Sequence, residues 1–463
     1  MAKLLKTNIL NRVFCQYNNC SYKFLSSTAS NDYQKQHYDV IIAGGGLVGV
    51  SLAVSLAQSE SLAEKKVLLL ESAPAFKQPS KEKYSNRVSA INKQSIGLLK
   101  SLNAWNHIES IRCKPVMQMQ VWDAISGEAI HFNHPNFSDQ VACIVENDLI
   151  LESLYKQLEN LLNVQVRNES RLESCKLPKD DVKKSEVTLK SGEQFSCDLL
   201  IGADGANSIV RQKMEVNNFA LSYKQMGVVA TLELDAEEAA GNSVAWQRFL
   251  PTGPVALLPL TDKLSSLVWS TNVEHAKELL RMEPEMFIEN LNEAYLKSYK
   301  TNSLVDKFMK TAEGAFPLGR NKMLQVPPRV KNLQEGSRAA FPLGFGHASS
   351  YVCRGAALIG DAAHRVHPLA GQGVNLGFGD VLKLTEILSE AVYSGSSLDN
   401  IQYLLKYEQE RLKANVPIMV GIHALQQLYC NDFPPFVLAR SLGLKITNFT
   451  PPLKKFFMEK ALA

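Results

Sequence analysis

Two short apolar runs lie near the start of the chain, with a glycine-rich turn and a helix-compatible segment between them. The first run, residues 39–43 (DVIIA), has the pattern of a buried strand whose charged end points outward. Apolar positions in residues 47–60 suit a helix, and the second run, residues 67–70 (VLLL), has the length of a strand. This order predicts a βαβ unit with parallel strands and a right-handed crossover.

The period of the apolar positions changes further along the chain. Strand-like patterns occupy residues 116–134, 164–190 and 223–272. Helical periodicity occupies residues 89–103, 147–162 and 402–428. Strands that alternate with helices toward both ends, with a block of strands in the middle, predict an α/β protein. Its two domains should share the chain non-contiguously.

The turn after the first strand has the sequence GGGLVG, which is a G-x-G-x-x-G motif. Gly44 permits a tight turn, Gly46 lets the backbone approach a pyrophosphate, and Gly49 lets helix and strand pack closely. The helix N-terminus presents free N–H groups to phosphates. Glu71, at the end of the second strand, is placed to accept hydrogen bonds from a ribose. The unit predicts a dinucleotide site without distinguishing NAD from FAD.

Two further motifs favour FAD. Residues 197–211 (CDLLIGADGANSIVR) predict a strand, a turn at Asp204 and Gly205, and the start of a helix. A simple NAD dehydrogenase has no need of a second turn of this kind, although an Asp-Gly turn that only caps an ordinary helix is the alternative. Residues 360–377 (GDAAHRVHPLAGQGVNLG) follow a predicted strand at 356–359.

Together the three motifs resemble those of the flavoprotein aromatic hydroxylases of the para-hydroxybenzoate hydroxylase type, over about residues 38–430. The resemblance implies FAD as cofactor. It also implies a Rossmann-like α/β FAD-binding domain of the GxGxxG type, an interleaved β-sheet substrate domain and C-terminal helices. The residues expected to contact FAD are Gly44, Gly46, Gly49, Glu71, Arg87, Asp204, Gly205, Asp361, Pro368, Gly371, Gly373 and Asn375.

The resemblance gives several of these residues a role. Arg87 would contact an FAD phosphate, the alternative being a solvated loop charge, and Asp361 would accept a hydrogen bond from the ribityl chain. Residues 371–375 would open a helix whose N-terminus faces the pyrimidine edge of the flavin. The helix dipole there would stabilise negative charge on the reduced flavin.

Residues 245–260 (AWQRFLPTGPVALLPL) and Trp269 resemble the substrate-domain signature of the UbiH-type hydroxylases of ubiquinone biosynthesis. This resemblance implies hydroxylation, at ring position C5, of a polyprenyl-4-hydroxybenzoate-type phenol by O₂ through a flavin C4a-hydroperoxide. From the residues alone, 246–260 predict only two strands joined by a Thr-Gly-Pro turn. No general base is assignable, and Arg248 and Phe249 are the candidates for the substrate region, Arg248 being equally consistent with a surface strand position.

The resemblance also implies partners, and two alternative functions remain open. We expect an external electron donor, either a ferredoxin-type protein or NAD(P)H, and other ubiquinone-biosynthesis proteins. A reductase or desaturase of a prenyl lipid could use the same FAD-binding frame. A non-catalytic scaffold of a biosynthetic complex is a third hypothesis, but the intact glycine and aspartate motifs argue against it.

The motif order predicts the domain boundaries. The FAD-binding domain should comprise residues 38–113, 144–217 and 341–400. The substrate domain should comprise residues 114–143 and 218–340, and residues 401–463 should form a C-terminal helical region.

Length, charge and cysteines narrow the functional class. A chain of 463 residues suggests two joined domains, and a net charge of +4 is too small to indicate nucleic-acid binding. The eight cysteines form no C-x-x-C pair, so reduced, buried thiols are expected. His364 and His367 have no evident third ligand nearby, so no metal site is predicted. The uncharged residues 40–59 fit a strand and a helix better than a membrane span, because glycines interrupt them.

Both ends of the chain are basic. Residues 1–31 carry four cations, no carboxylate and apolar residues at helical spacing, which is typical of a mitochondrial transit peptide; the alternative is a solvated N-terminus. Residues 433–463 mix Phe and Leu with charged residues. These are Arg440, Lys445, Lys454, Lys455, Lys460 and one acid, Glu459. Such a tail suits peripheral contact with an anionic bilayer or a partner, at the matrix face of the inner membrane, or else a packed helix with solvated lysines.

Overall fold

The computed structural model describes residues 35–78, 82–134, 137–179, 183–239, 241–299, 325–430 and 433–450. The chain divides at Gln36 into two units, and the second unit, residues 37–463, contains the elements that follow. The predicted transit peptide, residues 1–31, lies outside the described residues.

The first sheet contains the predicted βαβ unit. Among the described residues it has eight strands, of which six follow the order β18-β19-β11-β1-β2-β8, while β10 also pairs with β11, and β9 pairs with β10. Its strands are β1 (Gln36–Ala43), β2 (Val67–Leu70), β8 (Val164–Arg167), β9 (Leu172–Lys176), β10 (Ser185–Leu189), β11 (Gln194–Gly202), β18 (Val352–Cys353) and β19 (Ala356–Leu358). β1 pairs parallel with β2, and the helix α1 (Leu47–Gln58) connects them. The predicted βαβ unit is therefore confirmed.

The second sheet collects most of the strands predicted for the middle of the chain. Its nine described strands run in the order β20-β17-β12-β15-β14-β13-β5-β6, with β16 also paired to β12. They are β5 (Gln118–Asp123), β6 (Ala129–Asn133), β12 (Asn218–Leu234), β13 (Val244–Leu250), β14 (Gly253–Pro259), β15 (Leu264–Asn272), β16 (Val330–Leu333), β17 (Ala339–Ala348) and β20 (His364–Arg365). The hairpins β5–β6 and β13–β14 are those that the alternation predicts.

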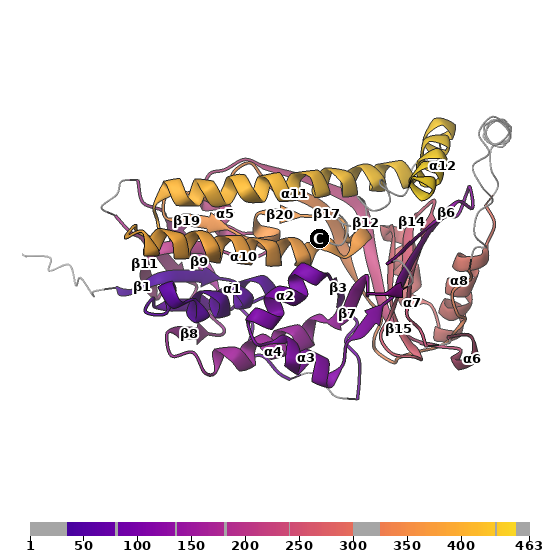
Figure 1. The fold of residues 1–463 in the computed structure, drawn as a ribbon, viewed down its shortest axis with the longest axis horizontal. Helices are drawn as coiled ribbons and strands as arrows, with labels where there is room; N and C mark the ends of the chain where they lie inside the picture. Colours follow the sequence, from indigo (N-terminus) through magenta and orange to yellow (C-terminus); the bar gives the residue numbers. More distant parts are fainter. Residues whose placement is uncertain are drawn as a thin grey trace, which may run out of the picture. The chain divides into compact units, whose positions relative to one another are not determined.

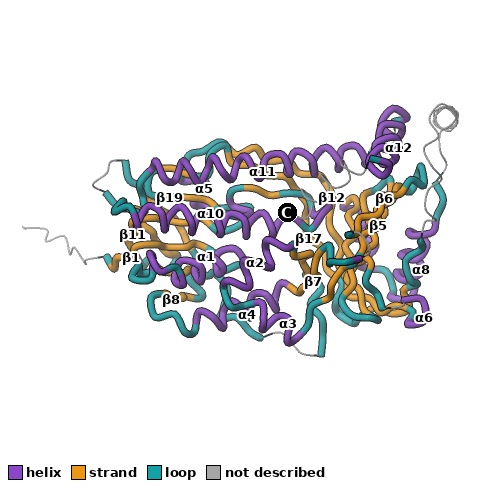
Figure 2. Tube along the Cα trace, in the orientation of Figure 1, coloured by secondary structure: helices purple, strands orange, loops and turns teal. Residues whose placement is uncertain are grey.

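A small third sheet and the helices complete the fold. The third sheet pairs β3 (Val88–Ile91), β7 (Ala142–Glu146) and β4 (Lys114–Val116). The remaining helices are α2 (Lys93–Ser101), α3 (Trp105–Ile111), α4 (Asn147–Leu158), α5 (Ile209–Lys213), α6 (Ala236–Ala239), α7 (Val273–Arg281), α8 (Pro284–Leu296), α10 (Gln372–Tyr393), α11 (Ile401–Tyr429) and α12 (Pro434–Phe449). Helix α10 packs between α1 and α11 (Figure 1). Helix α11 runs past both sheets, from β18 to α12 (Figure 2).

One predicted helix begins too early, and two predicted boundaries divide strands, of which the one between residues 143 and 144 falls inside β7. Residues 88–91 form β3 rather than the start of a helix, because their buried positions alternate and pair with β7. The helix α2 starts only after Asn92, whose side chain accepts the N–H of Ser95 as an N-cap. The boundary expected between residues 340 and 341 falls inside β17, which pairs with β12 in the second sheet.

Candidate functional site

A cavity that we call the first cavity lies at the carboxyl ends of β1, β2 and β11 and has a volume of about 520 Å³. It is lined by Gly44, Gly46, Glu71, Asp204 and Gly205, among others. Open α/β sheets bind ligands outside the carboxyl ends of their strands. Two of the sequence motifs thus meet at one cavity in the expected part of the fold.

The conformation of the first turn depends on its glycines. Gly44 has a φ of +114°, and a Cβ there would clash with the carbonyl oxygen of Ala203. A Cβ on Gly49 would clash with the carbonyl oxygen of Gly44, so α1 would be pushed off the strand. Gly46 has no atom within 4 Å of the position of a Cβ. The backbone at Gly46 is therefore open to a ligand phosphate.

Two carboxylates border this cavity. The carboxylate of Glu71 accepts the N–H groups of Gly45 and Ala73, both at 2.7 Å. One oxygen of Asp204 accepts the N–H of Ile209 at 2.7 Å and so caps α5. The other oxygen, Oδ1, is buried and has no hydrogen-bond partner among the described residues. A buried acceptor without a partner is uncommon in proteins and fits a site that a polar ligand completes.

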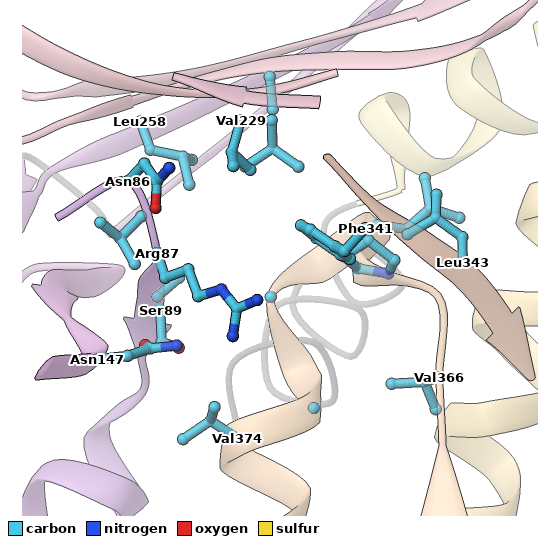
Figure 3. Close-up of a pocket in the computed structure, with 18 of the residues that line it drawn as sticks. Asn86, Arg87, Ser89, Asn147, Val229, Leu258, Phe341, Leu343, Val366 and Val374 are labelled. Carbon is cyan, nitrogen blue, oxygen red and sulfur yellow. The ribbon is translucent and has the colours of Figure 1, made fainter. Parts of the chain in front are cut away.

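The second cavity, of about 400 Å³, lies between the second sheet, β3 and the third motif (Figure 3). The second sheet supplies an apolar wall of Val229, Ala256, Leu258, Val268, Phe341 and Leu343. Across from Val229 and Leu258, Figure 3 shows Ser89 and Asn147, with the guanidinium of Arg87 extending into the cavity. The cavity therefore combines an apolar wall that suits a hydrophobic ring with a few polar groups.

A buried ion pair fixes the loop that carries Arg87. Arg112 donates to the carboxylate of Glu146 through Nε at 2.5 Å and Nη2 at 3.0 Å. The same carboxylate accepts the N–H of Ser85 at 2.6 Å. Glu146 ends β7, and the next residue, Asn147, donates its N–H to the carbonyl of Arg87 at 3.0 Å. The loop therefore has little freedom to move Arg87 out of the cavity.

The third motif brings Asp361 to the second cavity, in the 3-10 turn η3 (Gly360–Ala362). Desolvation by the surrounding protein raises the pKa of Asp361, and the charges of His364 and Arg365 oppose this shift. The carboxyl is nevertheless exposed on the side of the cavity. It is thus available to a ligand hydroxyl.

A buried carboxylate, Asp380, holds this turn in place. Its Oδ2 accepts the N–H of Gly360 at 2.8 Å and bonds to Nε2 of His364 at 2.6 Å. Its Oδ1 accepts Nε of Arg411 at 2.7 Å and Nδ2 of Asn415 at 3.3 Å. Burial would raise the pKa of Asp380, but His364, Arg411 and the Gly360 N–H lower it to about 2. Through Asp380 on α10 and Arg411 on α11, this cluster links both helices to the turn η3, which carries Asp361.

The start of α10 forms another side of the second cavity, through Pro368 of the 3-10 turn η4 (Pro368–Ala370), Gly371 and Gly373. Gly371 adopts the left-handed conformation, with φ of +61°, where the chain enters the helix. Asn375 is not among the cavity-lining residues. Its side chain donates to the carbonyl of Ala90 at 2.9 Å and accepts the hydroxyl of Ser95 at 2.8 Å. It therefore joins α10 to the third sheet and α2 rather than facing the cavity.

The two substrate-region candidates lie outside the cavity-lining set. Arg248 is buried, and its guanidinium donates to the carbonyls of Ala294 at 2.9 Å and Lys297 at 2.8 Å, at the end of α8. Phe249 stacks on Tyr429 of α11 with ring centroids 3.8 Å apart. The residue on β13 that lines the cavity is Gln247. Alternation along a strand predicts two faces, but not which face turns to the cavity.

Sequence reasoning also missed several residues that the fold brings to the site. Asn147, Phe341 and Leu343 line the second cavity from elements that carry no recognisable motif, and Ser89 lines it two residues after Arg87. Arg365 also lines it and lies inside the third motif, where its charge was a usable signal.

The histidines of the third motif have no metal-binding arrangement. Among the described residues, no group of three or more His, Cys, Asp or Glu side chains could hold a metal ion. His364 bonds to Asp380, as described above. His367 is fully buried, burial lowers its pKa to about 4, and both ring nitrogens lack a hydrogen-bond partner in the described part of the chain.

Comparison with known proteins assigns a cofactor to this architecture. The FAD binding domain family matches residues 37–313 and 345–419. The mitochondrial ubiquinone biosynthesis monooxygenase COQ6 of Drosophila melanogaster is 56% identical over 431 residues, which cover 92% of this chain and 90% of the relative. The human protein of the same name is 44% identical over 431 residues, covering 91% of this chain and 92% of the relative.

A solved structure shares the fold. The FAD complex of HpxO from Klebsiella pneumoniae superposes with a TM-score of 0.65 at 17% identity, covering 92% of this chain and 99% of that one. At this identity the likeness concerns the fold alone.

Proposed function

Because the chain belongs to the family of FAD-dependent monooxygenases of mitochondrial ubiquinone biosynthesis, we propose that it hydroxylates ring position C5 of a polyprenyl-4-hydroxybenzoate-type phenol. The observation that carries this proposal is the second cavity. It joins the apolar wall of the second sheet to Arg87, Asp361 and the start of α10. We propose that the phenolic ring lies between this wall and the flavin.

We place the two halves of FAD in the two cavities. The adenosine and pyrophosphate would lie in the first cavity, where the backbone at Gly46 is open and Glu71 and Asp204 offer carboxylate oxygens. The ribityl chain and flavin would extend to Asp361 and Arg87 in the second cavity. When bound, FAD supplies the oxygen-transfer chemistry, for which a flavin C4a-hydroperoxide is the proposed reagent.

The chain's own residues would bind the ring and keep water away from it. The apolar wall of β12, β14, β15 and β17 excludes water from the space over the flavin. The N–H groups at the start of α10, next to Gly371, would stabilise negative charge on the flavin ring. Arg365 lines the same cavity and donates to the carbonyl of Pro342 at 2.5 Å. Its charge is placed to attract a ring carboxylate.

The proposal extends to the surroundings of the protein. The relatives are mitochondrial, and we propose the matrix face of the inner membrane as the place of work. Within the described residues, no helix is both long and apolar enough to cross a membrane. We propose that electrons come from outside the chain, from a ferredoxin-type protein or NAD(P)H, and that other ubiquinone-biosynthesis proteins are partners.

Labelled oxygen tests the proposed reaction. The purified protein, supplied with each electron donor in turn, is given ¹⁸O₂ and a short-chain 3-prenyl-4-hydroxybenzoate. We expect one labelled oxygen in the product, located at C5 by NMR. An unlabelled, reduced or desaturated product would contradict hydroxylation, and label at another ring carbon would contradict the regiochemistry alone.

A further inference from the structure

Two cysteines of the third sheet lie on the same face of it. Cys143 lies on β7 opposite Pro115 of β4, and Cys113 directly precedes β4. Side chains two residues apart in an extended strand point to the same face, so Cys113 shares the face of Pro115 and Cys143. Both thiols pack in the core cluster that also contains Ile91 and Val145. The fold therefore makes neighbours of two cysteines that the sequence separates by β4, β5 and β6.

The two thiols also form a hydrogen bond. The Cys143 thiol donates to the sulfur of Cys113 and so lowers the pKa of Cys113, although burial and the charge of Glu109 raise it. The same hydrogen bond, together with burial, raises the pKa of Cys143. The pair therefore favours a thiolate at Cys113 and a thiol at Cys143. The thiolate is the form of cysteine that reacts with oxidants.

The two cysteines differ in their exposure to solvent. Cys113 is partly exposed, whereas Cys143 is 1% exposed. A small oxidant can thus reach the sulfur of Cys113, while the protein covers that of Cys143. An accessible thiolate next to a second, covered thiol is the arrangement of a reacting cysteine and its resolving cysteine.

A second pair of cysteines offers a comparison within the same chain. The charges of Cys175 and Cys353 interact, so these two sulfurs also lie near each other. Burial, however, raises the pKa of Cys175 to about 12 and that of Cys353 to about 11. Both residues are therefore thiols at neutral pH, and Cys113 differs from them in its lowered pKa.

We propose that Cys113 and Cys143 form a site of reversible oxidation, at which hydrogen peroxide converts the two thiols to a disulfide. The Cys113 thiolate attacks the peroxide, the O–O bond breaks, hydroxide leaves and Cys113 becomes a sulfenic acid. The Cys143 thiol then displaces water from the sulfenic acid, and the S–S bond forms. The two thiols lose two electrons and two protons in all, and one H₂O₂ becomes two molecules of water. The oxidant is the two-electron reduction product of O₂, which the proposed hydroxylation consumes.

The disulfide would join the two ends of an excursion of the chain. After Cys113 the chain runs through β4 into β5 and β6 of the second sheet, and it returns through β7. Arg112 directly precedes Cys113, and Glu146 ends β7. These two residues form the ion pair that holds the loop of Arg87. The cross-link would therefore restrain the two segments that carry this ion pair.

Peptide mapping of the oxidised protein tests the proposal. The FAD-loaded protein is freed of reductant, treated with a small excess of H₂O₂, alkylated and digested without reduction. We expect mass spectrometry to show a disulfide between Cys113 and Cys143 that dithiothreitol reverses. In the same digest Cys175 and Cys353 should be oxidised at least about tenfold more slowly, because far less of each is thiolate.

Two variants separate the roles of the paired cysteines. Cys143→Ser removes the resolving thiol, so dimedone should label the sulfenic acid at Cys113, and more H₂O₂ should carry Cys113 on to the sulfinic acid. Cys113→Ser should leave Cys143 reduced. Flavin absorbance shows that each variant is folded, and the wild-type map does not depend on either variant.

Any of three results would overturn the proposal. These are oxidised wild type without the Cys113–Cys143 disulfide, Cys143→Ser without dimedone label at Cys113, and oxidation of Cys175 and Cys353 as fast as that of Cys113. None of these measurements uses hydroxylation, so a failure of the proposed function would leave the test of this site intact.

Discussion

Substituting Asp380 tests whether its buried ion pairs hold the turn that carries Asp361. Asp380→Asn keeps the shape of the side chain but removes the charge that His364 and Arg411 share. Both partners are buried, with accessible fractions of 2% and 8%. Breaking a buried ion pair on one side typically costs about 3–5 kcal/mol, because the remaining charge has lost its partner. We therefore expect the free energy of unfolding to fall by about 3 kcal/mol or more.

Urea unfolding of the FAD-free protein measures this loss, and flavin fluorescence titration measures the accompanying change in FAD affinity. Affinity should fall because Asp380 also accepts the N–H of Gly360, next to Asp361. The control is Glu390→Gln, which breaks the exposed pair between Glu390 and Lys406 and should cost less than about 1 kcal/mol. If Asp380→Asn cost no more than the control, the buried cluster would not hold the turn.

The pH dependence of stability is a second test of the role of Asp380. The pKa of Asp380 is lowered to about 2 in the folded protein, below the ordinary value of about 3.9. A lowered folded-state pKa stabilises the fold above the unfolded value, and the stabilisation is lost as pH falls through the folded value. Of the roughly 2.6 kcal/mol that this group contributes in all, wild type should lose roughly 1.8 kcal/mol between about pH 4 and pH 2. The difference between wild type and Asp380→Asn should therefore narrow over this range, and a constant difference would refute the assignment.

Two further predictions concern the site itself. Asp361→Ala should weaken FAD binding roughly 10- to 100-fold, because it removes a charged hydrogen-bond acceptor. Gly46→Val should give folded protein with little flavin absorbance. Full flavin occupancy in either variant would show that FAD is misplaced in our account. Arg248→Met should lower the free energy of unfolding by about 1–3 kcal/mol, because the buried carbonyl of Ala294 and the part-buried carbonyl of Lys297 lose their donor. KM for the short-chain phenol should not change. A raised KM at unchanged stability would show that Arg248 belongs to the substrate site.

The local parts of the site could be predicted from the sequence. Gly44, Gly46 and Asp204 lie in turns that follow strands, so a short stretch of chain defines both the motif and its place in the fold. The same holds for the hairpin β13–β14 and for the long helix α11, whose bounds, Ile401–Tyr429, lie within one residue of the predicted range 402–428.

Contacts between distant segments could not be predicted. Arg112 and Glu146 are 34 residues apart, and Arg440 and Asp123 are 317 apart, so no local pattern pairs them. Arg440 was assigned to the surface because a charge in a basic tail is usually solvated, and its buried partner lies on β5. Similarly, alternation along β13 did not show that Arg248 turns toward α8 and Gln247 toward the cavity.

The most direct test of the central claim is an experimental structure of the protein with FAD and a short-chain 3-prenyl-4-hydroxybenzoate bound. We predict density for the adenosine half against Gly46 and Glu71, and for the flavin ring beside Asp361. The substrate ring should lie between the flavin and the wall that contains Val229 and Phe341. Flavin density outside the second cavity, or a substrate ring away from this wall, would contradict the account.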